Sequence, residues 1–467
     1  MDVQDITAKL WYLCNILREA GITYPEYVTE LTYLLFLKMS QETRSERDLP
    51  KGYRWSDLTS RKGQEQFQFY KTLLRTLGDS KRAGVSEIFA DAETCLSQAK
   101  HLTLLVEEFD AIDWYSAREE TALADLYEGL LEKNSTESKS GAGQYFTPRS
   151  LIDSIVNVTK PRIGEIIQDP ACGTAGFLIA ADRFIKQHTD DYSKLTERQL
   201  AFQRERAFVG IELVPKTHKL ALMNAMLHGI YGPILLGDAL GETGASVTRA
   251  DIILTNPPFG TKRGAGLPSR PFPIPTSNKQ LAFLQHIYLG LKPAGRAAVV
   301  MPDLQGSTAR RVCTDLMEKC NLHTVLRLPM GIFYALGVKT NVLFFTRGNT
   351  DSKNTSSVWI YDLRTNMPRF GKRTPLTREH FVQFEEAYGE KADGTGKRTD
   401  QGPTSRFRQF SREDIQADGG NLDIVWLNER RSTTSIQKSP NQLIREVAKN
   451  LRVVLKELDS LAKETKK

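Results

Sequence analysis

The chain has 467 residues, of which 40% are apolar, and it carries a formal net charge of +7 with an isoelectric point of about 9.0. This composition is ordinary for a folded protein of two or three domains, and its basic balance mildly favours a polyanionic partner. It excludes a membrane span, because no window approaches about eighteen uninterrupted apolar residues, and the acidic start MDVQDITAKLWYL excludes a signal peptide.

The five cysteines are odd in number, form no CxxC pair and have no histidines at metal-ligand spacing. We therefore expect neither structural disulfides nor a metal site, which fits the reducing cytoplasm.

Residues 1–135 are predicted to form a helical domain. Apolar residues recur at helical spacing in two stretches, which the turn-like sequence GITYPE (21–26) separates. The repeating positions are Ile6, Leu10, Leu13, Leu17, Val28, Leu31, Leu35 and Met39. No residues here have catalytic spacing, so we interpret the domain as a bundle that packs and presents surfaces.

Residues 136–435 are predicted to form an α/β domain. After the polar connector EKNSTESKSGAG, strands alternate with helices as far as about residue 365, the pattern of a parallel sheet. The predicted strands are 163–168, 207–211, 233–236, 251–255, 296–301, 323–328 and 341–347. The polar stretch that follows includes GEKADGTGKRTDQGPTS (389–405), which is predicted to be a mobile loop.

Residues 436–467 are predicted to form a terminal helix. Ser439, Pro440 and Gln442 form a capping box with proline at the first helical position. A heptad seam follows, at Ile444, Val447, Leu451, Val454, Leu458 and Leu461. Such a stripe opposite a charged face favours docking on a partner subunit, although the helix could instead lie on its own domain.

The stretch IIQDPACGTAGFLIAA (166–181) places a glycine-bearing turn between a strand that ends at Asp169 and a following helix. Ligands bind beyond the carboxyl ends of strands in an open parallel sheet, and Gly173, Ala175 and Gly176 let a ligand approach the backbone closely. A dinucleotide site would require GxGxxG, whereas this turn has GxxG beside a carboxylate. The carboxylate repels phosphate and suits an ammonium group, so the ligand is expected to be zwitterionic.

Three further strand ends carry polar side chains. Glu212 can accept both hydroxyls of a ribose, Asp238 can accept from an adenine amine, and the strand DIILT runs into Asn256. Four successive strands thus bring Asp169, Glu212, Asp238 and Asn256 to one edge of one sheet, which indicates a binding site there.

Together these segments resemble the N6-adenine DNA methyltransferases that use S-adenosylmethionine. DPACGTAGF resembles the methionine-binding loop of that family, NPPF (256–259) its catalytic tetrapeptide, and GAGQYFTPR (141–149) the segment that closes over the cofactor. The segments DLYEGLLEK, GVKTNVLFF and RTNMPRFGKRTP, and the start of the chain, resemble the modification subunit of type I restriction–modification systems. The likeness spans roughly residues 5–430.

The resemblance implies a Rossmann-like methyltransferase domain of a prokaryotic cytoplasmic protein, with roles for particular residues. The implied cofactor-binding residues are Gln144, Tyr145, Phe146, Thr147, Pro148, Arg149, Asp169, Thr174, Ala175, Gly176, Glu212 and Asp238. The implied catalytic residues are Asn256, Pro257, Pro258 and Phe259. It also implies double-stranded DNA as substrate, a specificity subunit that reads the target sequence, a restriction subunit, and a second copy of this chain in the complex.

The chemistry of adenine explains why a buried strand ends in Asn-Pro-Pro-Phe. The exocyclic amine is a poor nucleophile because its lone pair is delocalised into the ring. Acceptors at its hydrogens, the Asn256 side-chain oxygen and the Pro257 carbonyl, stabilise the charge that develops on nitrogen. The prolines stiffen the turn and remove backbone donors, and Phe259 can stack on a base that has left the helix.

The stretch GTKRGAGLPSRPFPIPTSNK (260–279) follows this turn. It carries Lys262, Arg263, Arg270 and Lys279 and no acid, so it is predicted to be a mobile loop that contacts DNA phosphates. A solvated surface loop is the alternative.

Other functions remain open from the residues alone. NPP-aromatic turns also occur in enzymes that methylate protein glutamines or RNA, and a scaffold that has lost catalysis would keep the sheet. A dehydrogenase is disfavoured by the missing GxGxxG. Cys172 has no nearby histidine, so we interpret it as structural rather than nucleophilic.

Overall fold

The computed structural model describes residues 12–18, 21–42, 46, 49–111, 147–259, 268–333, 339–368, 370, 374–417, 420 and 422–427. The chain divides into two compact units, Met1–Val425 and Trp426–Lys467. Several predicted features lie outside the described residues: Ile6 and Leu10, the segment 144–146, the 135/136 domain boundary and the terminal helix. None of the helices among the residues described is long and apolar enough to cross a membrane.

Between residues 12 and 111 the described chain forms helices and loops without a strand. Helical residues 12–18 precede α2 (Tyr24–Glu42), α3 (Trp55–Thr59), α4 (Gly63–Gly78), α5 (Ala83–Ile88) and α6 (Ala99–Asp110). The apolar positions that the sequence predicts to face the core are buried at Leu13, Leu17, Leu31, Leu35 and Met39. One carboxylate ties three elements together, because Asp110 accepts from both Lys38 Nζ (3.0 Å) and Trp55 Nε1 (2.9 Å).

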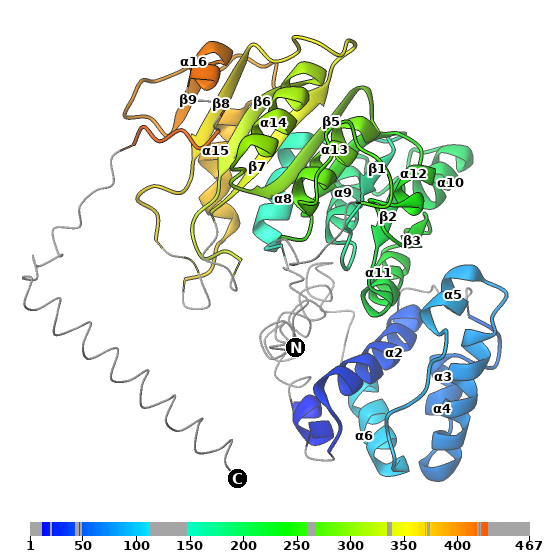
Figure 1. Cartoon of the computed structure of the whole chain (residues 1–467). Coiled ribbons are helices and arrows are strands. Elements are labelled where there is room, and N and C mark those ends of the chain that lie inside the picture. Colours follow the sequence, from blue (N-terminus) through cyan, green and yellow to red (C-terminus); the bar gives the residue numbers. More distant parts are fainter. Residues whose placement is uncertain are drawn as a thin grey trace, which may run out of the picture. The chain divides into compact units, whose positions relative to one another are not determined.

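Nine strands form a single mixed sheet in the order β3-β2-β1-β4-β5-β7-β6-β8-β9, with helices on both faces (Figure 1). The strands are β1 (Ile167–Asp169), β2 (Phe208–Glu212), β3 (Ile234–Leu236), β4 (Ala250–Thr255), β5 (Leu291–Pro302), β6 (Cys320–Arg327), β7 (Thr340–Arg347), β8 (Ser357–Asp362) and β9 (Phe407–Ser411). The helices of this part are α8 (Arg149–Thr159), α9 (Gly176–His188), α10 (Glu197–Glu205), α11 (Pro215–Leu227), α12 (Glu242–Ser246), α13 (Lys279–Gly290), α14 (Ser307–Lys319), the short 3₁₀ helix η2 (Arg378–Phe381), α15 (Val382–Tyr388) and α16 (Arg412–Ala417).

The predicted α/β fold is confirmed, but the expectation of a parallel sheet is wrong at β7. β7 pairs antiparallel with both β5 and β6, and β9 pairs antiparallel with β8. The sequence also gave no prediction of β8 or β9. β7 is buried on both faces, so its apolar run NVLFF does not reveal its direction, and β9 is a half-exposed edge strand without clear alternation.

Successive residues of β4 face opposite helix layers. Ile252 and Leu254 join the core cluster that includes α8 and α9, whereas Ile253 lies against Gly290 of α13. This alternation follows from the two-residue period of a strand. The chain moves outward from β1 through β2 to β3 and then returns to β4 on the other side of β1. The carboxyl ends of β1 and β4 therefore flank the topological switch point, where open α/β sheets bind ligands.

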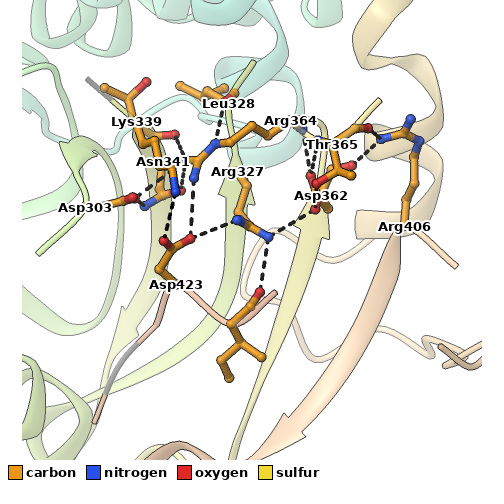
Figure 2. A network of polar contacts seen from close by, with 12 residues as sticks. Asp303, Arg327, Leu328, Lys339, Asn341, Asp362, Arg364, Thr365, Arg406 and Asp423 are labelled. Carbon is orange, nitrogen blue, oxygen red and sulfur yellow. Dashed lines mark hydrogen bonds and ion pairs between the residues drawn. The ribbon is translucent and has the colours of Figure 1, made fainter. Parts of the chain in front are cut away.

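A polar network lies at the carboxyl ends of β6 and β8 (Figure 2). Arg327, which is almost fully buried, donates to Asp362 (3.0 Å) and to Asp423 (2.8 Å). Arg364 contacts the same Asp423 carboxylate at 3.4 Å and donates to the backbone carbonyl of Leu328 at 3.1 Å. Asp423 thus holds the segment 422–425 between two arginines of the sheet.

Residues 389–405 form a loop, as the sequence predicts, but part of it is held against the sheet. The Arg398 guanidinium donates to the Tyr388 carbonyl (3.0 Å) and to the Thr324 hydroxyl (2.9 Å). It also lies over the Tyr388 ring, 4.8 Å from the centroid. The expected mobility therefore does not extend to Arg398.

Candidate active site

The turn after β1 is held by backbone contacts to β2. The N–H of Cys172 donates to the Ile211 carbonyl at 3.0 Å, and the N–H of Gly173 donates to Glu212 Oε2 at 3.0 Å. Gly173 and Ala175 both have left-handed backbone (φ +53° and +68°), and α9 begins directly afterwards at Gly176. These hydrogen bonds hold the turn close to the end of β2. A Cβ on Gly173 would meet no atom within 4 Å, so its backbone faces open space.

Asp169 ends β1 as a buried carboxyl group. Burial raises its pKa to about 7, and the charge of Glu212 adds to this effect, while the Thr255 hydroxyl and the Ala171 N–H oppose it. The N–H of Ala171 donates to Oδ1 at 3.1 Å. Burial destabilises the ionised form of this carboxyl group more than its hydrogen bonds stabilise it. A cationic group placed against the carboxylate would therefore stabilise the ionised form.

Glu212 and Asp238 follow the next two strands. Glu212 is buried and also accepts from the N–H of Val214 (2.8 Å), and burial raises its pKa. Asp238 is exposed and accepts from the N–H of Leu240 at 2.8 Å. The backbone hydrogen bonds from Gly173 and Val214 hold the Glu212 carboxylate beside the turn that follows β1.

Two leucines that the sequence reasoning missed lie beside these acids. Leu213 and Leu236 are 58% and 49% exposed. Leu213 directly follows Glu212, and Leu236 is the register partner of Glu212 in β3 and lies two residues before Asp238. The alternation of the strands gave no signal for this exposure.

Asn256 follows β4 and is held by a residue from the segment before the sheet. Its Nδ2 donates to the Thr147 hydroxyl oxygen at 2.9 Å. Its Oδ1 is buried and accepts a hydrogen bond from none of the described residues. Pro257 is buried and Pro258 is exposed, and neither has a backbone N–H to offer.

Phe259 meets a second aromatic ring that the sequence reasoning missed. Phe333 lies edge-on to it, with ring centroids 5.6 Å apart and an interplanar angle of 76°. Phe333 lies in the described loop stretch 328–333, which follows β6. This loop is fixed from β8's side, because the N–H of Phe370 donates to the Met330 carbonyl at 3.2 Å and Arg364 donates to Leu328. The sequence signal that could have identified Phe333 is its position as an aromatic residue shortly after a predicted strand.

Three residues of the predicted cofactor segment are described. Pro148 is the N-cap of α8, Arg149 is its first residue, and Thr147 contacts Asn256 rather than standing apart from the catalytic turn. Gln144, Tyr145 and Phe146 lie outside the described residues. α8 packs against α9, the helix that carries the glycine turn. Arg149 and Gly176 line one small cavity between these helices.

The loop after the catalytic turn differs from the prediction in its second half. The Arg270 guanidinium contacts the His286 ring and lies over Phe272, 4.7 Å from the ring centroid. The Ile274 N–H donates to the side-chain oxygen of Gln285, and the side-chain NH₂ of Gln285 donates to the Ile274 carbonyl, each at 2.9 Å. This part of the loop is therefore anchored to α13. Lys279 is the first residue of α13. Lys262 and Arg263 lie outside the described residues.

Cys172 is buried and its burial raises the pKa of the thiol well above the ordinary range, which fits a structural role. Within the described ranges no group of three or more His, Cys, Asp or Glu side chains could hold a metal ion.

Comparison with known proteins identifies the family. Residues 118–433 match the family described as N-6 DNA methylase. The chain belongs to this family. The StySPI methylase subunit of the type I restriction enzyme from Salmonella potsdam is 48% identical to this methylase over 99% of its length and 96% of the relative's. The EcoKI methylase subunit of Escherichia coli K12 is also 48% identical over the same shares.

Solved structures agree with the sequence relatives. The crystal structure of the EcoKI M protein covers 98% of this methylase and 96% of its own chain, with 45% identity and a TM-score of 0.60. A subunit from a structure that concerns complex assembly and conformational transition of the type I system covers 97% of each chain, with 27% identity and a TM-score of 0.69. The chain is therefore a methylase subunit of the type I restriction enzyme family.

Proposed function

We propose that this methylase transfers a methyl group from S-adenosylmethionine to adenine N6 in duplex DNA at the carboxyl ends of β1, β2 and β4. Its family makes it an N6-adenine DNA methyltransferase, and the residues that act are the proposal. The observation that carries it is Asn256, whose Oδ1 is a buried acceptor without a described donor, while its Nδ2 is bound by Thr147. Such an acceptor is stabilised by a donor from the substrate.

The residues present fit the cofactor. The buried Asp169 carboxyl group suits an ammonium, the open backbone at Gly173 admits a ligand, and the Glu212 carboxylate, which ends β2 beside that turn, would accept from ribose hydroxyls. We propose the turn Thr174–Gly176 and the segment 144–149 as further contacts, and Asp238 as the acceptor for the cofactor's adenine amine. The exposed Leu213 and Leu236 would offer apolar surface to its ring. When bound, S-adenosylmethionine supplies a methyl group on a positively charged sulfonium.

The base pocket acts on the nucleophile. Asn256 Oδ1 and the Pro257 carbonyl would accept the two hydrogens of the adenine amine, which localises its lone pair and stabilises positive charge as the new N–C bond forms. No nucleophilic side chain is needed. The amine nitrogen loses a proton only after it has been methylated, because the positive charge that it then carries lowers its basicity. Alignment of the amine by two fixed acceptors supplies much of the remaining rate.

Two aromatic rings would enclose the base. Phe259 would stack on one face, and Phe333, which already contacts Phe259 edge-on, would limit the pocket on another side. Aromatic contact offsets the cost of unstacking a base from the duplex, which is a few kcal/mol. Pro258 stiffens the chain between Pro257 and Phe259.

We propose that the methylase acts within a complex of the type I kind, with a specificity subunit that reads the target, a restriction subunit and a second copy of itself. The relatives are named as subunits of type I restriction enzymes, and this chain matches them over nearly its whole length. The basic net charge of +7 suits the DNA partner. We propose the predicted terminal helix, 436–467, as a docking element.

The deciding experiment is methyl transfer from labelled S-adenosylmethionine to genomic DNA, with the product nucleoside identified. The full chain is assayed alone and with its specificity subunit, beside Asn256→Ala and the matched control Asn321→Ala on β6. We expect N6-methyladenine with the partner, its loss in Asn256→Ala with cofactor binding retained, and no change in the control. Methylation that survives Asn256→Ala would refute the assigned site.

A further inference from the structure

The hydrogen bond between Thr147 and Asn256 joins two segments that stand 109 residues apart in the chain. Thr147 lies directly before α8, whereas Asn256 directly follows β4. The bond uses the amide nitrogen of Asn256 and leaves its oxygen unbound among the described residues. The Asn256 amide nitrogen is therefore held by the protein, while its oxygen is left for a donor from a ligand.

We propose that Thr147 is a positioning residue: its hydroxyl oxygen accepts from the Asn256 amide and thereby keeps Oδ1 as the acceptor for the adenine amine. The inference rests on the proposed function and deepens it at the same site. It gives Thr147 a role in the methyl-transfer step beyond the cofactor contact that the sequence resemblance implies.

An asparagine in this position needs orienting. The oxygen and NH₂ group of an amide have nearly the same shape, and the last side-chain torsion of asparagine has broad, roughly two-fold preferences. If the amide turned over, its NH₂ group would face the amine of adenine, and two donors would meet without an acceptor. The Thr147 hydroxyl can accept from NH₂ or donate to Oδ1, but only the orientation with NH₂ towards Thr147 leaves an acceptor for the adenine amine, so both ends of the side chain are satisfied in that orientation alone.

The fold gives Thr147 a fixed position from which to do this. Pro148 caps α8, and Ser150 in the first turn donates to the Leu376 carbonyl at 2.9 Å. Asp153 of the same helix pairs with Arg183 of α9. Thr147 is itself buried. The Thr147 hydroxyl is therefore held in place by α8 and α9, the two helices beside the glycine turn. Its bond to Asn256 is a direct contact between the predicted cofactor segment and the catalytic turn.

Removing the hydroxyl leaves a partly buried NH₂ group without its acceptor in the productive orientation. The loss of an acceptor from such a group typically corresponds to roughly a ten-fold to hundred-fold fall in rate if it is felt in the transition state. Thr147→Val keeps the shape and removes only this acceptor. Thr147→Ser keeps the acceptor and removes only a methyl group.

The test uses the full chain with its specificity subunit. Methyl transfer is measured for Thr147→Val, Thr147→Ser, Asn256→Ala and the control Thr72→Val on α4, together with the Kd of each variant for S-adenosylmethionine. We expect kcat of Thr147→Val to fall about ten-fold to hundred-fold, with KM for DNA and the cofactor Kd within about two-fold of wild type. Thr147→Ser should remain within a few-fold of wild-type kcat, and the control should be unchanged.

The outcomes separate this inference from the proposed function. If Thr147→Val retains wild-type kcat while Asn256→Ala is inactive, the positioning role is refuted and the proposed function stands. If Thr147→Val instead weakens cofactor binding in proportion to its loss of activity, Thr147 is a cofactor contact and the inference is also refuted. If Asn256→Ala stays active, the proposed function itself fails.

Discussion

Asp169 gives the proposed cofactor site a pH dependence. Its pKa lies at about 7 in the free protein, so much of it is protonated below that pH. An ammonium ligand requires the ionised form. We therefore expect the affinity for S-adenosylmethionine to rise about ten-fold per pH unit as the pH approaches 7 from below and to level off above it. Titration calorimetry between pH 5.5 and 7.5 would measure this.

The same shift acts on stability with the opposite sign. The folded-state pKa lies above the ordinary value of 3.8, so this group favours the folded state below about pH 4 and loses that contribution as the pH rises through 7. Asp169→Asn should bind the cofactor weakly and without the pH slope. A slope that persists in this variant would assign the titration to another group, such as Glu212.

Phe333 permits a test of the pocket wall. Phe333→Ala removes the ring that lies edge-on to Phe259, so we expect weaker retention of an extruded base and about a ten-fold fall in kcat/KM for DNA. Fluorescence of 2-aminopurine at the target position reports the extrusion. Phe333→Leu should restore part of the loss if bulk matters. Equal activity of Phe333→Ala and wild type would exclude the ring from the pocket.

The sequence predicted which strand ends lie together better than which side chains touch. Asp169, Glu212 and Asn256 follow strands whose aliphatic runs are readable, so their shared edge could be predicted. The partner of Asn256 could not, because Thr147 lies 109 residues away and only the packing of α8 brings them together. Leu213 and Leu236 were missed for a related reason: strand alternation predicts which residues are buried, not which exposed ones bind a ligand.

At the scale of elements, α8 depends on β5. Lys160 ends the helix with left-handed backbone, and Arg296 of β5 donates to the last carbonyls, those of Thr159 (2.6 Å) and Lys160 (2.8 Å). The same guanidinium pairs with Glu165 at 2.7 Å. Three acceptors around one side chain suit the fork of an arginine and not the single point charge of a lysine.

Arg296→Lys should therefore destabilise the fold by about 1–2 kcal/mol. The urea midpoint of the full chain measures the effect, and Arg311→Lys on the exposed side of α14 is the matched control. Because Thr147 lies two residues before α8, we expect a small loss of methyl transfer beside the loss of stability. An unchanged midpoint would mean that water replaces the arginine's donors at the helix end.

The errors in the predicted sheet arise at this scale as well. Length and apolar content predicted β7 but could not give its direction, because a strand buried on both faces reads alike in both orientations. β9 pairs only with β8 and has one buried residue among its five, so its sequence FRQFS carries no apolar run to recognise. Pairing partners, which no single sequence displays, decide both features.

At the scale of the whole molecule, the network in Figure 2 joins the end of the first compact unit to the sheet. Asp423 lies between Arg327 and Arg364, which come from positions 96 and 59 residues earlier in the chain. Arg364 also holds the Leu328 carbonyl, where the loop that leads to Phe333 begins. The segment before the predicted docking helix is thus anchored to the part of the sheet that frames the base pocket.

Asp423→Asn should loosen this anchor. The variant keeps the size of the side chain but removes the negative charge that both arginines share, and the Asp423 side chain is only 19% exposed. Leaving the two buried guanidinium groups without that charge should lower the free energy of unfolding by roughly 2 kcal/mol, less than for a fully buried pair because the Asp423 carboxylate is partly exposed. Urea unfolding measures the loss, and limited proteolysis should show faster cleavage beyond α16.

Asp351→Asn is the matched control, since Asp351 pairs with Arg347 on the surface and its side chain is 68% exposed. It should leave the urea midpoint unchanged. Raised salt should weaken the Asp423 anchor little, because buried charges are poorly screened. If Asp423→Asn matches its control in both unfolding and proteolysis, the two arginines are satisfied by Asp303 and Asp362 alone. The segment 422–425 is then held by the packing of Leu422, which lies buried beside Asp423.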